Sequence, residues 1–290
     1  MCADLSSRTV ISPSWGIPFG APFQPDLVGV LLLPLYVTIC VGGLLCNSVL
    51  VAVMPMHLRL KSVSDVMVWN LALADIVALL AVPAHLAQML LPGCLFGQLL
   101  CKVHLSVSYL DRLSISLILS LMSVERCWAV KRPRVTPPAG RQTSAVVWGL
   151  CCLIWLVFPE CMQHWVAVWR WGSLAVLYGL PACTLLPCYS LLLLRLRAAG
   201  RHFPIRRRAI SRVSRRVAGC IGVFAVCWTP FYVFMVVALI VQLEPSYGAE
   251  MARRVCVFLG TASSCVNPVV YGLLDSRVHR HWTLTTCAWK

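Results

Sequence analysis

The chain has 290 residues, of which 59% are hydrophobic and 12% are charged, and its mean hydropathy is +0.80. Soluble domains carry about 25% charged residues, so this composition excludes an ordinary soluble domain and indicates an integral membrane protein. The formal net charge of +15 does not indicate nucleic-acid binding, because the basic residues recur in loops between apolar segments and no RNA-binding motif accompanies them.

Residues 1–25 are rich in Pro, Ser and Gly, which predicts a short extracellular arm. They lack a charged start followed by an apolar run, so we expect no cleavable signal peptide. The first spanning helix is expected to direct membrane insertion itself.

Seven apolar segments follow the arm, each long enough to cross a hydrocarbon core of about 30 Å. We predict helices over Asp26–Met54, Ser62–Leu90, Gln98–Val130, Thr143–Pro159, Val166–Arg197, Arg207–Val241 and Ala249–Tyr271. Most Lys and Arg fall in alternate loops and in the tail, which places these loops in the cytoplasm and the N-terminus outside. The predicted fold class is all-α, a seven-transmembrane bundle over residues 26–272. Residues 273–290 are predicted to form a short amphipathic C-terminal helix, lying on the membrane, and a tail.

Polar residues interrupt several of these apolar runs. A carboxylate such as Asp75 in mid-membrane must face the bundle interior, where other polar groups satisfy it. Pro230 and Pro268 each remove a backbone hydrogen bond and should kink their helices, and a kinked helix can adopt two arrangements, as a switch requires. For any single site, polar helix packing and ordinary membrane prolines remain the alternative.

The 16 cysteines lie mostly inside apolar segments, where they are interpreted as small buried hydrophobes. No Cys and His spacing indicates zinc, and no phosphate-binding Gly-rich loop or hydrolytic triad is present in the sequence. The sequence therefore predicts neither an enzyme nor a bound organic cofactor.

The motifs taken together resemble the class A (rhodopsin-like) G-protein-coupled receptors over residues 26–282. Glu125-Arg126-Cys127 stands where that family has Asp-Arg-Tyr, and Asn267-Pro268-Val269-Val270-Tyr271 fits its Asn-Pro-x-x-Tyr motif. Trp148, Pro181 and Tyr189 fit its helix-four tryptophan and its helix-five proline and tyrosine. By itself, a charged pair such as Glu125-Arg126 at a membrane boundary could equally be a signal that ends a spanning helix.

The resemblance implies a ligand-driven switch in a multi-pass plasma-membrane protein whose partner is a heterotrimeric G protein. A ligand displaces Trp228 and Phe224, the inner end of helix six moves outward, and Arg126 leaves Glu125 to receive the G protein. The implied switch residues are Glu125, Arg126, Tyr189, Phe224, Trp228, Pro230, Asn267, Pro268 and Tyr271. No acid stands at the base of helix six to hold Arg126, so we expect some basal activity.

The resemblance also implies a disulfide between Cys101 and Cys161, although the second extracellular loop is very short. Asp75 resembles the family's sodium-binding acid, but Ile115 replaces the usual helix-three serine, and Asp111 could supply the missing oxygen. The predicted sodium or polar cluster comprises Asp75, Asp111, Ser263, Ser264 and Asn267, with a hydrogen-bonded structural cluster as the alternative. Cys287 is a candidate for palmitoylation.

Ser108 stands where amine receptors carry an aspartate, which argues against an amine ligand. Arg112, one turn deeper, needs an anion or strong acceptors, which either an internal carboxylate such as Asp75 or a ligand could supply. The residues predicted to contact the ligand are Lys102, His104, Ser108, Arg112, Phe231, Tyr232, Met235 and Arg254.

Local motifs disagree about the ligand. Arg126 to Pro133 and the Ser-Ser-Cys-Val-Asn-Pro run at 263–268 resemble leukotriene and other chemoattractant receptors, whereas Cys227 to Tyr232 resembles the somatostatin, opioid and melanin-concentrating-hormone group. We favour an acidic lipid or peptide chemoattractant, with a neuropeptide as the alternative. A non-coupling decoy and a transporter are the other functions considered, and the absence of an inverted sequence repeat argues against a transporter.

Overall fold

The computed structural model describes residues 27–58, 63–90, 97–129, 204–243 and 246–274, together with short stretches and single residues between 142 and 194. The described helices are α1 (Leu27–Val53), α2 (Val63–Leu90), α3 (Gly97–Ala129), α7 (Pro204–Ile240) and α8 (Tyr247–Leu274). Two π-helical turns are also present, η1 (Met54–Leu58) directly after α1 and η2 (Ala175–Gly179).

Every regular element in the described part of the chain is helical, which confirms the all-α class. The first, second, third, sixth and seventh predicted helices correspond to α1, α2, α3, α7 and α8, with ends that differ by three residues or fewer. The predicted fourth and fifth helices fall in a region where the structure describes only short helical stretches, single helical residues and η2. The N-terminal arm and the C-terminal tail lie outside the described residues.

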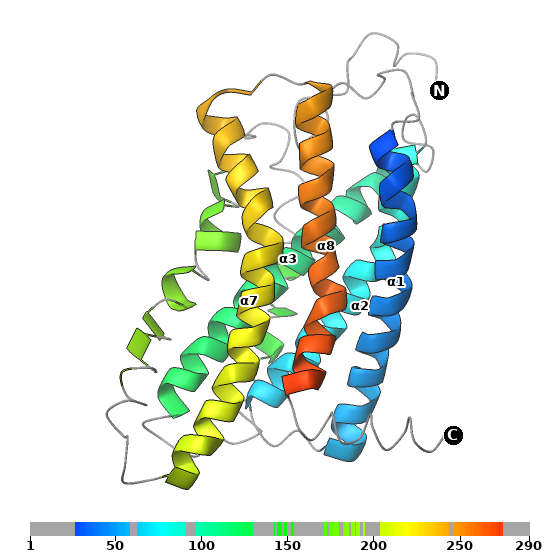
Figure 1. Ribbon diagram of the computed structural model, residues 1–290. Coiled ribbons are helices and arrows are strands. Elements are labelled where there is room, and N and C mark those ends of the chain that lie inside the picture. The colour runs from blue at the N-terminus through cyan, green and yellow to red at the C-terminus, as the bar shows by residue number, and fades with distance from the viewer. Residues whose placement is uncertain are drawn as a thin grey trace.

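The helices form a bundle in which α8 lies between α7 and α1 (Figure 1). α8 packs against α7, α1 and α2, while α2 also packs against α1 and α3. In Figure 1, α3 crosses the bundle obliquely behind α7 and α8. α8 and α2 therefore each touch three of the other long helices, so a movement in one helix can reach the others through either of them.

Within the described part of the chain, three helices are long and apolar enough to cross a membrane by length and composition: Val30–Met56, Val63–Leu86 and Val217–Ile240. Large apolar side chains are exposed on their outer faces, among them Leu45 at 63% and Val226 at 75%. Water would disfavour such a surface, whereas lipid tails solvate it. The outward apolar faces and the inward polar groups described below are what a lipid environment requires.

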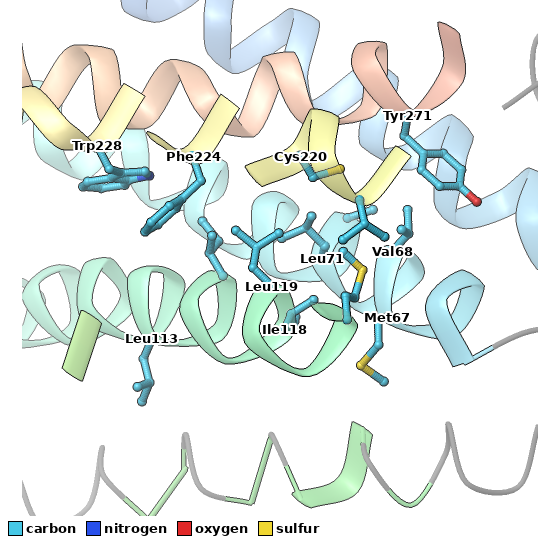
Figure 2. Close-up of a cluster of buried hydrophobic side chains, with 14 of the residues drawn as sticks. Met67, Val68, Leu71, Leu113, Ile118, Leu119, Cys220, Phe224, Trp228 and Tyr271 are labelled. Carbon is cyan, nitrogen blue, oxygen red and sulfur yellow. The ribbon is translucent and has the colours of Figure 1, made fainter. Parts of the chain in front are cut away.

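The core lies where α2, α3, α7 and the inner end of α8 meet (Figure 2). Met67, Ile118 and Met122 are fully buried there, and Phe224 and Trp228 enter from α7. A second, smaller cluster joins the outer halves of α1 and α2 and contains Leu32, Tyr36, Leu79 and Val82.

Amide side chains join helices across this apolar interior. Asn47 donates from Nδ2 to the carbonyl of Ser264, 2.8 Å away, and so ties α1 to α8. Asn70 on α2 accepts a 2.8 Å hydrogen bond from the indole Nε1 of Trp148 and donates a 2.6 Å hydrogen bond to Ser144. Such bonds hold helices together where no water is available to satisfy polar groups.

Candidate functional site

Trp228 stands at the centre of the predicted switch and links α7 to α8. Its side chain is only 5% exposed, and its Nε1 donates to the hydroxyl of Ser263 on α8 at 3.3 Å. The Ser263 hydroxyl in turn donates to the carbonyl of Gly260 at 2.6 Å. A Cβ on Gly260 would lie 2.8 Å from the indole ring, so the absence of a side chain there lets the ring rest against the backbone of α8.

Aromatic rings surround Trp228 and extend its contacts along α7. Phe231 meets its indole edge to face at a centroid distance of 6.0 Å, and the Tyr232 ring lies 6.2 Å away. Tyr178 in η2 packs on Tyr232 at 4.8 Å and on Phe224 at 6.2 Å. The Tyr178 hydroxyl also makes a 2.9 Å hydrogen bond with Thr229, which fixes η2 to α7 beside the indole.

Arg112 lies against the same aromatic group. Its guanidinium carbon is 4.7 Å from the ring centroid of Tyr109, 5.6 Å from that of Trp228 and 5.4 Å from that of Phe231. The negative faces of aromatic rings attract a cation at these distances. Arg112 therefore lies at the level of Trp228, and its positive charge connects α3 to the switch.

Two buried carboxyl groups lie between α2 and α3. Asp75 is fully buried, and the amide of Asn267 lies 3.4 Å from its Oδ2, while the Ser264 hydroxyl is also within hydrogen-bond reach. Asp75 and Asp111 are close enough to interact electrostatically. In each of these two aspartates, the Oδ1 oxygen accepts no hydrogen bond.

Four of the five residues predicted for this polar cluster are thus brought together. The fifth, Ser263, uses its hydroxyl on Trp228 and Gly260 instead. The described residues contain no group of three or more His, Cys, Asp or Glu side chains that could hold a metal ion. A cation here would therefore be held by two carboxylates and neutral oxygens.

At the inner end of the bundle, the start of α2 holds residues from two other helices. The Ser64 hydroxyl donates to Oε2 of Glu125 on α3 at 2.8 Å, and the Tyr271 hydroxyl of α8 donates to Oδ1 of Asp65 at 3.2 Å. Ser64 and Asp65 are each 4% exposed and Tyr271 is 2% exposed. The Arg126 backbone belongs to α3, but its side chain lies outside the described residues.

Sequence reasoning identified Glu125 and Tyr271 but missed Ser64 and Asp65. The available signal was weak: an acidic residue in the first turn of α2, directly after a basic loop. An acid in a first turn is a common response to the helix dipole, so its position alone did not indicate a contact between helices.

The other predicted residues fall into two groups. Pro230 and Pro268 lie inside α7 and α8, and Tyr232 and Met235 are buried on α7. Lys102, His104, Ser108 and Cys101 belong to the backbone of α3, but their side chains lie outside the described residues, as do Cys161, Pro181, Tyr189 and Cys287 altogether. The disulfide and the palmitoylation therefore stay predictions.

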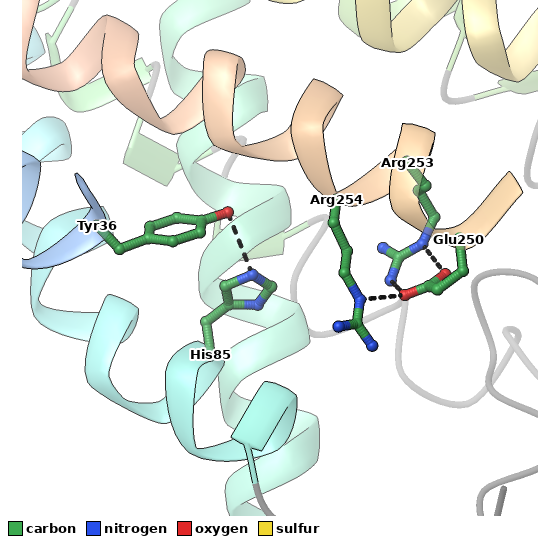
Figure 3. Close-up of polar contacts among 5 residues, drawn as sticks. All are labelled: Tyr36, His85, Glu250, Arg253 and Arg254. Carbon is green, nitrogen blue, oxygen red and sulfur yellow. Dashed lines mark hydrogen bonds and ion pairs between the residues drawn. The ribbon is translucent and has the colours of Figure 1, made fainter. Parts of the chain in front are cut away.

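Figure 3 shows the contacts at the outer ends of α1, α2 and α8. Glu250 accepts hydrogen bonds from Nε of Arg253 at 2.7 Å and from Nε of Arg254 at 3.0 Å, so one carboxylate faces two guanidinium groups. The Tyr36 hydroxyl lies 3.4 Å from Nε2 of His85, joining α1 to α2. Of the predicted ligand residues, Arg254 is thus placed in a cluster with excess positive charge.

Replacing Gly260 with Ala should destabilise the protein, because the new methyl group would meet the Trp228 ring at 2.8 Å. Overpacking of this kind costs about 1–3 kcal/mol. Thermal unfolding of the purified protein in detergent should show a lower midpoint for Gly260→Ala.

Gly222→Ala on α7 is the matched control, since nothing lies within 4 Å of its added Cβ. Alanine favours a helix over glycine by about 1 kcal/mol, so this control should be neutral or stabilising. Equal midpoints for the two variants would contradict the packing described for Trp228.

Comparison with known proteins agrees with this arrangement of helices and motifs. The model of the 7 transmembrane receptor (rhodopsin family) matches residues 46–159 and 156–271. Human somatostatin receptor type 3 is 34% identical over 276 residues, covering 86% of this chain and 66% of the relative. Bovine somatostatin receptor type 5 is 28% identical over 287 residues, covering 91% of this chain and 78% of the relative. Mouse somatostatin receptor type 3 is 31% identical over 284 residues, and the chain again spans 66% of that relative's length.

The matched regions contain the described parts of α2, α3 and α7, together with the polar residues that join α8 to α1 and α2. Because the family model matches well over half of the chain, this protein belongs to the 7 transmembrane receptor (rhodopsin) family.

Proposed function

We propose that this protein is a receptor that transmits the binding of an extracellular peptide to a heterotrimeric G protein. The family consists of receptors rather than enzymes, and its members are multi-pass proteins of the plasma membrane. The proposed orientation, with the N-terminus outside and the C-terminus in the cytoplasm, is supported by the distribution of basic loops.

The observation that carries the proposal is a series of contacts along α8 from the aromatic core to the inner end of the bundle. Near its middle, α8 touches Trp228 through Ser263 and Gly260. Toward its inner end, it contacts Asp75 through Asn267 and Asp65 through Tyr271. A displacement of the indole must therefore disturb a helix that also holds the start of α2.

This geometry can act as a switch without any chemical step. A ligand that binds one arrangement of the bundle more tightly than the other shifts the population by its difference in affinity and by no more. Pro230 in α7 and Pro268 in α8 interrupt the backbone hydrogen bonds of the two helices that pack on each other. Their bends would let the inner ends move while the core contacts persist.

The somatostatin receptors among the relatives support a peptide ligand. They favour the neuropeptide alternative over the leukotriene-type lipid that the Arg126 to Pro133 motif suggested, and they give no specific support for chemotaxis. The motif Cys227 to Tyr232, which resembles the peptide group, contributes three of the described aromatic rings around the switch.

Nucleotide exchange on purified Gα proteins tests this function. Receptor in lipid nanodiscs should accelerate exchange when a panel of neuropeptides that includes somatostatin is added, and Arg126→Ala should abolish the acceleration. The variant must first show a wild-type thermal midpoint, so that loss of coupling is distinguished from loss of fold. Exchange that stays at background with every Gα protein and every peptide would contradict the proposal and favour a non-coupling decoy.

We also propose that the space between Asp75 and Asp111 holds a sodium ion. The residues present fit such an ion, because two buried carboxylate oxygens, one from each acid, accept no hydrogen bond. The Ser264 hydroxyl oxygen lies beside Asp75 and could add a neutral ligand, whereas Asn267 presents its amide nitrogen to Asp75 Oδ2. Hard cations prefer oxygen ligands, and the positive charge would relieve the repulsion between the two acids.

Sodium chloride should therefore raise the thermal midpoint of the purified protein more than choline chloride at the same concentration. Asp75→Asn should remove this difference. Asp65→Asn is the matched control, because Asp65 is also a buried acid of α2 but contacts Tyr271 instead. A sodium effect that survives in Asp75→Asn, or that choline reproduces, would show that the two acids form only a structural cluster.

A further inference from the structure

The described part of α3 contains four buried serines, and one of them uses its hydroxyl differently from the others. A serine hydroxyl inside a helix commonly donates to a carbonyl three or four residues earlier in the same helix. Ser114, Ser120 and Ser123 all donate in this way. Ser116 instead donates to the carbonyl of Val176 in η2, 3.2 Å away. Its side chain is fully buried, so the bond is made inside the bundle.

The acceptor of this bond belongs to a π-helical turn. Such turns depart from the regular α-helical ladder, are rare and occur mostly at functional sites. The Val176 side chain is 44% exposed, so the residue faces outward while its carbonyl meets α3. Inside a membrane no water replaces a lost partner of a backbone carbonyl. The Ser116 hydroxyl therefore supplies a donor from another helix where the backbone is irregular.

The same turn holds α7 through Tyr178. The Tyr178 hydroxyl makes a 2.9 Å hydrogen bond with Thr229, and its ring packs on Phe224 and on Tyr232. These contacts lie on both sides of Trp228 along α7. η2 is thus bound to α3 through its backbone and to α7 through a side chain, so a shift of the turn must move the Tyr178 ring relative to α7.

We infer that Ser116 is a positioning residue of the switch, which fixes η2 so that Tyr178 holds the middle of α7. The inference rests on the proposed receptor function and adds a connection from α3 to α7 that does not pass through α8. Without the Ser116 hydroxyl, the turn can relax and carry Tyr178 away from Thr229. The outward movement of α7 then costs less, and the G-protein-competent arrangement becomes more populated.

Fluorine NMR on the full chain in nanodiscs tests the positioning without any G protein. The probe is 3-fluorotyrosine in place of Tyr178. Ser116→Ala should shift the resonance of this probe or divide it into two. Ser123→Ala is the matched control, because it also removes the hydroxyl of a buried serine, but one that bonds within α3, and it should leave the resonance unchanged.

The functional consequence is measured as nucleotide exchange on Gα without ligand. Ser116→Ala should raise basal exchange about fivefold over wild type, the change in population expected from the loss of one buried hydrogen bond. Ser116→Cys keeps a side chain of similar size and a weak donor, so it should give an intermediate increase. If Ser116→Ala fails to fold, the comparison of Ser116→Cys with Ser123→Cys decides in its place.

Thr229→Val removes the hydroxyl at the other end of the connection with little change of shape. Because both hydrogen bonds act on the same turn, Ser116→Ala should add little to basal exchange in the Thr229→Val background. Full additivity of the two substitutions would show that they act separately and would contradict the inference.

A Tyr178 resonance that is unchanged in Ser116→Ala, or that changes equally in Ser123→Ala, would overturn the inference. A changed resonance with wild-type basal exchange, in a receptor that responds to peptide, would also overturn it. Exchange at background in every protein, with or without peptide, would instead contradict the proposed receptor function. The resonance of the probe would then still decide whether Ser116 positions Tyr178.

Discussion

An ionisable or amide side chain within a lipid-surrounded helix is stable only when it faces the bundle interior and finds a partner there. The rest of this structure depends on that constraint. The faces of α1 and α7 that point outward carry large apolar side chains, and the buried polar residues of α1, α2, α3 and α8 face the bundle interior. Asn47, Asp65 and Asp75 each contact α8. The hydrogen bonds that satisfy these buried polar groups therefore also connect the helices.

Helix α8 takes part in all of these contacts, which follow one another along its length. Its middle carries the glycine and serine on which Trp228 rests, and its inner part carries the residues that meet α2. The start of α2 also holds Glu125 of α3 through Ser64. A change at the indole can therefore reach the inner end of α3 through two helices, without a continuous hydrogen-bonded path. What connects the two ends is the packing of α8, and we expect Pro230 and Pro268, which interrupt the backbone hydrogen bonds of α7 and α8, to allow this packing a second arrangement.

The membrane helices were predictable because a spanning segment must be apolar over a fixed length, and five predicted helices differ little from the described ones. Individual switch residues were predictable where a motif marks them, as for Trp228 and Asn267. Ser64 and Gly260 were not, because a serine or glycine in a helix has many uses and only its neighbour in another helix reveals which one applies. The same holds for Arg112: the sequence shows an arginine one turn below Ser108 but not the aromatic rings against which it packs.

The ligand class shows a different limit of local sequence reasoning. Short motifs near Arg126 and near Trp228 favoured different groups of receptors, and only similarity over most of the chain favoured the peptide group. Residues at an inner loop are constrained by the membrane surface and by the intracellular partner, so they carry little information about what binds outside.

The central claim is that polar contacts between helices hold the described arrangement against a second, G-protein-competent one. The most direct test is ligand-independent nucleotide exchange by Ser64→Ala, which removes the hydrogen bond from α2 to Glu125. A hydrogen bond to a charged group contributes about 1.5–3 kcal/mol, so we predict an increase of about tenfold in basal exchange. Ser120→Ala removes a bond within α3 only and should leave basal exchange unchanged. Equal basal exchange in the two variants would contradict the claim.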